Sequence, residues 1–147
     1  MSINTMSAAS VGSTRPTGKG LHIGLWTTQV VLAALFVMSG VTKLTAPVDQ
    51  LQAQMPWVSG ALGGAVRIIG VAELLGALGL LLPAATRIMP VLTTVAGIGL
   101  SALMLGASVT HLARGEFAMI AFTLPVAGLA AFVAWGRFSA SPIASRG

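Results

Sequence analysis

The chain has 147 residues, of which 55% are hydrophobic and only 7% are charged. Ordinary soluble domains carry about a quarter charged residues, so this composition excludes a water-facing surface and indicates an integral membrane protein of one domain. The net charge of +5 comes from single lysines and arginines between apolar runs, without the basic stripe that nucleic-acid binding needs. The sequence has no cysteine, which excludes disulfides, thiol redox chemistry and thiolate metal sites.

The first 20 residues are rich in serine, threonine and glycine, and they predict a disordered cytoplasmic tail (1–20). An apolar run follows at about 23–43. It is longer than the ~7–15 residues of a signal-peptide core, so we expect a retained membrane span rather than a cleaved leader.

Four apolar segments reach the roughly 20 residues that a membrane-crossing helix requires. They lie at about 23–43, 61–82, 88–110 and 117–136. The runs are continuous rather than alternating, and lipid leaves no backbone group unpaired, so helices are predicted and barrel strands are not. The expected fold is an all-α, antiparallel four-helix bundle (21–138) with both termini on the same side and a short C-terminal tail (139–147). The second helix is expected to stop at Pro83.

The connections and charges suggest an orientation. The long connection at 45–60 contains one expected amphipathic turn around Val48 to Met55. Basic residues are more numerous on the side that would hold both termini, which predicts cytoplasmic termini in a bacterial inner membrane. That side carries Arg15, Lys19, Arg87, Arg137 and Arg146, and the other carries Lys43, Arg67 and Arg114.

Small or polar residues at three- and four-residue steps predict the face that each helix buries against its neighbours. In the first two helices these faces are Gln29, Ala33, Phe36, Gly40 and Lys43, then Gly70, Glu73, Ala77 and Leu80. In the third helix the face comprises Pro90, Thr94, Gly97, Ser101, Met104, Ser108 and His111. In the fourth it comprises Ala121, Pro125, Gly128 and Phe132.

Glu73 is the only carboxylate inside a predicted span. A charged acid in hydrocarbon costs several kcal/mol, so it must be protonated, paired or in contact with water. Arg67 is a poor partner, because six residues place the two side chains about 120° apart around the helix. Lys43 and His111 end their helices on the side nearest Glu73. The sequence therefore predicts a polar cluster of Lys43, Glu73 and His111, with Ser39, Ser108 and Thr110 nearby.

Three interpretations of this cluster stay open. Lys43 and Glu73 could form an ion pair that only fixes helix register. The cluster could instead bind a small molecule, a quinone headgroup or a proton, because a desolvated carboxylate beside histidine has a shifted pKa. In the third, Lys43 reaches water without a partner. No catalytic residue is assigned, and no metal-ligand spacing is present. We therefore expect no stand-alone catalysis and no covalent or metal-held cofactor, with a quinone as the alternative ligand.

Three segments carry a resemblance to a known family. They are FVMSGVTKL (36–44), GVAELLGALGLLL (70–82) and GASVTHLARG (106–115), and their order matches across about 29–135. In these segments the chain resembles the DoxX-like membrane proteins. The resemblance implies a four-helix membrane bundle with Lys43, Glu73 and His111 at the family's polar positions. It implies little about activity: the family's namesake is associated with a thiosulfate:quinone oxidoreductase, but this chain has no cysteine for a redox role of its own.

Relatives in that family act as partners or assembly factors of other membrane proteins. The leading expectation is therefore a non-catalytic accessory subunit of a membrane complex, or a homo-oligomer, in contact with the lipid bilayer. The first alternative is a protein that binds a quinone or another small lipophilic ligand. The second is a small proton-coupled transporter, which is ranked last because such transporters carry the acid in their first helix.

Overall fold

The computed structural model describes residues 18–58 and 62–146, and every regular element in those ranges is a helix. Four helices are long and apolar enough to cross a membrane. They are α1 (Lys19–Thr45), α3 (Leu62–Thr86), α4 (Val91–Ala113) and α5 (Phe117–Trp135), and a π-helical turn, η1 (Gly136–Ala140), continues α5. The predicted four-helix membrane bundle is confirmed. The predicted tail lies mostly outside the described residues, although α1 already begins at Lys19.

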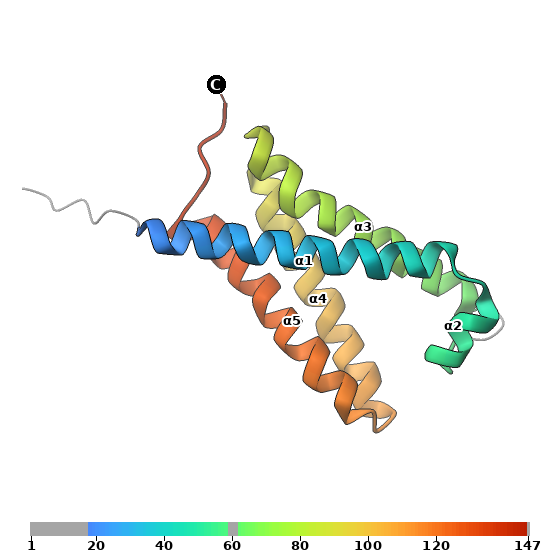
Figure 1. Cartoon of the computed structure of the whole chain (residues 1–147). Coiled ribbons are helices and arrows are strands. Elements are labelled where there is room, and N and C mark those ends of the chain that lie inside the picture. The colour runs from blue at the N-terminus through green and yellow to red at the C-terminus, as the bar shows by residue number, and fades with distance from the viewer. Residues whose placement is uncertain (1–17, 59–61, 147) are drawn as a thin grey trace, which may run out of the picture.

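The helices form two pairs, α1 with α3 and α4 with α5, and the pairs cross each other (Figure 1). Beyond the crossing they diverge, so the end of α1 lies well away from the turn between α4 and α5. The short helix α2 (Val48–Gln54) follows α1 at this splayed end, where the sequence predicts an amphipathic turn. At the opposite end α1 begins beside η1, where His22 Nδ1 lies 3.4 Å from Ser141 Oγ.

Helices α1 and α3 touch backbone to backbone. A Cβ added at Gly40 would lie 2.8 Å from the carbonyl oxygen of Gly70, and one added at Gly70 would lie 3.0 Å from that of Gly40. Two glycines allow this approach, as small residues do at helix contacts in membranes. Lys43 and Glu73 each lie three residues from this contact, and the long Lys43 side chain reaches the Glu73 carboxylate across it.

The core is built from apolar side chains of all four long helices, while their outer surfaces stay apolar and contact lipid. The main cluster contains Leu32, Phe36, Ala77, Leu80, Leu100, Met104, Val126, Ala130 and Val133. The faces predicted for the first two helices are confirmed, because Gln29, Phe36, Gly70 and Glu73 are all buried.

The face predicted for the last helix is wrong. Pro125 and Gly128 are exposed. The buried row is Thr123, Val126, Ala127, Ala130, Val133 and Ala134. The glycine at this contact belongs to α4: a Cβ on Gly97 would lie 3.0 Å from the carbonyl oxygen of Ala130. Pro125 and Gly128 therefore did not mark the contact face of α5, because the glycine at the close approach belongs to its neighbour α4.

The predicted stop at Pro83 is also wrong, since α3 continues to Thr86 with Pro83 inside it. Proline removes one N–H donor, and its loss is tolerated here because only one further turn follows. Thr86 donates its hydroxyl to the Leu82 carbonyl at 2.7 Å and supports that last turn. The chain leaves the helix through Arg87 at φ 60° and Met89 at φ 47°, so α4 begins at Val91 rather than at Ile88.

Candidate functional site

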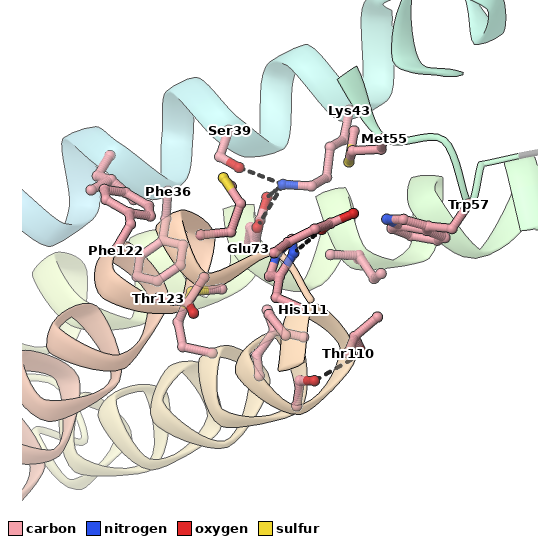
Figure 2. A pocket seen from close by; sticks show the side chains of 18 of the residues that line it. Phe36, Ser39, Lys43, Met55, Trp57, Glu73, Thr110, His111, Phe122 and Thr123 are labelled. Carbon is pink, nitrogen blue, oxygen red and sulfur yellow. Dashed lines mark hydrogen bonds and ion pairs between the residues drawn. The ribbon is translucent and has the colours of Figure 1, made fainter. Parts of the chain in front are cut away.

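A cavity of about 730 Å³ lies between the two helix pairs at their splayed end, and residues from α2 and the segment after it complete its wall (Figure 2). Most of the wall is apolar. It includes Phe36, Met55, Trp57, Met104 and Phe122. A chamber of this size and lining is typical of a site for a small organic molecule.

An ion pair forms the polar wall of this cavity. Lys43 Nζ lies 2.8 Å from Oε1 and 2.9 Å from Oε2 of Glu73, and 2.5 Å from Ser39 Oγ. The Glu73 side chain is 3% exposed and that of Lys43 is 15% exposed. Three acceptors match the three N–H groups of an ammonium. Lys43 thus has a partner inside the bundle, and the Ser39 hydroxyl hydrogen stays free to donate.

Arg67 does not join this ion pair and instead bonds to the backbone at the end of α1. Its guanidinium donates to the carbonyl of Lys43 and, at 2.8 Å, to the carbonyl of Ala46. Carbonyls at the end of a helix have no intrahelical partner, so these bonds stabilise the last turn of α1. Arg67 therefore fixes the backbone that carries Lys43, as its position around the helix relative to Glu73 allows.

His111 also lines the cavity, but it is bonded to Glu116 instead of Glu73. Its Nδ1 lies 2.6 Å from Glu116 Oε2, and Arg114 Nε donates to Glu116 Oε1 at 2.7 Å. Gly115 at φ 71° turns the chain so that the Glu116 amide donates to the His111 carbonyl. An ionised carboxylate only accepts, so Nδ1 carries the proton and Nε2 remains for another partner.

Glu116 offers a test of this arrangement by pH. Hydrogen bonds from Arg114 and then from His111 hold the pKa of Glu116 below its usual value of 4.5. The resulting stabilisation is present above pH 4.5 and is lost as the pH falls through the lower, folded-state pKa. We expect the melting temperature between about pH 5 and pH 3 to fall more steeply for the wild type than for Glu116→Gln. Parallel melting curves for the two proteins would show that the contact contributes nothing.

The other predicted polar residues are distributed around the site. Thr110 lines the cavity and donates to the Gly106 carbonyl at 3.0 Å. Ser108 lies outside the wall, between α4 and α5, where its hydroxyl is 2.7 Å from that of Thr123. The structure thus joins Ser39 to the Lys43–Glu73 pair and adds Glu116 and Thr123, which sequence analysis did not single out.

The charged groups that line the cavity are mostly paired with one another. Among residues 18–58 and 62–146, no three His, Cys, Asp or Glu side chains come together as metal ligands. The ion pair is internally balanced, which leaves the Ser39 hydroxyl and His111 Nε2 as hydrogen-bonding groups in an apolar chamber. The hydroxyl can donate to an acceptor oxygen and Nε2 can accept from a hydroxyl, so the groups suit a lipophilic molecule that carries oxygens.

The fold and the site together define a multi-pass membrane protein with a four-helix bundle, an apolar chamber and a buried ion pair. The model of the DoxX-like family matches residues 27–134, and the chain belongs to the DoxX-like family. No curated protein and no solved structure matches the chain. The matched segment contains Lys43, Glu73 and His111.

Proposed function

We propose that this protein binds a small lipophilic molecule with acceptor oxygens, such as a quinone, in the cavity at the splayed end of its bundle. The observation that carries the proposal is the Lys43–Glu73 pair, 2.8 Å apart, in the wall of an otherwise apolar chamber of about 730 Å³. A purely structural pair could be surrounded by packed side chains. Here the pair borders a space large enough for an aromatic ring and part of an isoprenoid tail.

The polar residues of the cavity have different roles in this proposal. Lys43 donates its N–H groups to Glu73 and Ser39, and the bond to Ser39 fixes the position of the serine hydroxyl. The Ser39 hydroxyl then donates to a carbonyl or hydroxyl oxygen of the ligand, and His111 Nε2 accepts a hydrogen bond from a ligand hydroxyl. Phe36, Phe122 and their apolar neighbours enclose the remainder of the molecule.

The protein acts in this proposal as an accessory subunit of a membrane complex, in a bacterial inner membrane with both termini in the cytoplasm. Binding and delivery of a quinone-like molecule need no catalytic group, which agrees with a site that offers only hydrogen bonds and apolar contacts. The basic residues outside the membrane-spanning segments support the orientation.

Filling the cavity tests the proposal. Ala107 lines it, so we expect Ala107→Phe to lower the affinity for decylubiquinone at least about tenfold, because the new ring occupies the ligand's space. Ala131 is exposed on α5 and does not line the cavity, so Ala131→Phe is the matched control and should bind normally. The measurement is quenching of Trp57, which lines the cavity, in a protein that carries Trp26→Phe and Trp135→Phe. Equal affinities for both phenylalanine variants would refute the proposal.

A further inference from the structure

A second cluster of polar residues lies at the other end of the bundle, around Arg137 in η1. Arg137 is only 5% exposed. Its Nε donates to Gln29 Oε1 at 2.7 Å, and its Nη1 lies 3.4 Å from the Ser141 carbonyl oxygen and 3.5 Å from His22 Nδ1. The guanidinium carbon lies 5.3 Å from the ring centre of Trp26. None of these contacts is to an acidic group.

No acidic side chain among the described residues pairs with Arg137. The sequence contains three acidic residues in all. Glu73 and Glu116 are paired at the splayed end, and Asp49 lies in α2 at that same end. Nη2 of Arg137 is buried with no hydrogen-bond partner among the residues that the structure describes. A buried cation without an anionic partner lowers the stability of the fold, and an anion from outside the chain would offset that cost.

A small cavity adjoins this cation. Its volume is about 210 Å³, and it is lined by Pro90, Val91, Thr94, Arg137, Phe138, Pro142 and Ile143. Val91 begins α4, and no side chain caps that helix end. The N–H groups of Leu92 and Thr93 bond to the carbonyls of Met89 and Pro90, and the helix N-terminus carries a partial positive charge that favours an anion. Two independent features, the buried arginine without an acidic partner and the N-terminus of α4, thus border one cavity.

We propose that this cavity binds a phosphate group, supplied by a phospholipid headgroup or by free phosphate. Phosphate matches the planar donors of an arginine and the N–H groups of a helix end. The rim favours the lipid as the source, because Phe138 is 74% exposed and Val91 is 55% exposed, which provides apolar surface for acyl chains. Arg146, whose backbone N–H donates to the Arg87 carbonyl at 3.0 Å, lies at this end but does not line the cavity.

The test is the melting temperature of the full chain in a neutral detergent, with dioctanoyl phosphatidylglycerol, dioctanoyl phosphatidylcholine and inorganic phosphate as separate probes. Phosphatidylglycerol should raise the wild-type melting temperature by about 3 °C or more, and phosphatidylcholine by much less, because its ammonium is repelled by the basic end. An equal rise with inorganic phosphate would keep the site and assign free phosphate as its ligand.

Variants test whether the rise in melting temperature comes from binding at this cavity. Arg137→Gln should abolish it, and because this change could also weaken the Gln29 contact, Ile143→Trp provides a second route that fills the cavity and leaves Arg137 in place. Arg146→Gln removes an exposed charge from the same end and should keep the full rise. An equal rise in all four proteins, or no rise with any phosphate probe, would overturn the proposal and leave a carboxylate of another protein as the counter-ion.

Discussion

Replacing Lys43 by methionine is expected to lower the free energy of unfolding by about 3–5 kcal/mol, because it leaves the Glu73 carboxylate buried without its cation. Glu73 is 3% exposed and its two oxygens lie 2.8 and 2.9 Å from Lys43 Nζ. A carboxylate in that position must take up a proton or break the α1–α3 contact to reach water. Reversible unfolding in mixed detergent micelles measures the loss.

The matched control is the double variant Lys43→Met/Glu73→Leu. It replaces both charges by apolar groups of similar volume, and such replacements are neutral or stabilising in other buried pairs, so we expect stability near that of the wild type. The double variant also separates stability from binding. A protein that folds normally but binds decylubiquinone weakly shows that the pair serves the ligand. Normal binding by the double variant would reduce the pair to a structural role.

Gly40→Ala is expected to destabilise the protein by about 1–3 kcal/mol, although alanine favours helices more than glycine does. The new Cβ would lie 2.8 Å from the Gly70 carbonyl oxygen and 2.9 Å from Leu74 Cγ, so α1 and α3 must move apart. Movement there also lengthens the Lys43–Glu73 contact. The same unfolding assay measures this change.

The same substitution at Gly99 in α4 is expected to stabilise the protein. Nothing lies within 4 Å of a Cβ at Gly99, so we expect a gain of about 0.5–1 kcal/mol from helix propensity alone. Opposite signs for the two glycine variants would support the backbone contact between α1 and α3. A gain at both positions would show that these helices do not approach as closely as the structure has them.

The sequence was sufficient to predict the membrane helices and the place of the ion pair, because both follow from simple constraints. Four runs of apolar residues must be helices in lipid, and a lysine at a nearby helix end can pair with the one carboxylate within them. Lys43 lies at such a helix end, and the structure has it in contact with Glu73.

Features that depend on turns and crossing angles were not predictable in the same way. Glu116 reaches His111 because Gly115 adopts φ 71°, and residue spacing alone does not indicate that turn. The buried face of α5 is set by where Gly97 of α4 lies against it. Arg137 was interpreted as a membrane-flanking cation, yet η1 carries it into contact with Gln29 of α1. Each case requires knowledge of a second element's position.

The most direct test of the ligand site is mass spectrometry of the small molecules that co-purify with the protein after mild extraction from a bacterial membrane. The proposed function predicts a quinone or a similar acceptor-bearing lipophile at near-stoichiometric level with the wild type and with Ala131→Phe. It predicts strong depletion of that molecule with Ala107→Phe, whose new ring fills the cavity. The same trace level in all three preparations would contradict the proposal that this chamber holds a ligand.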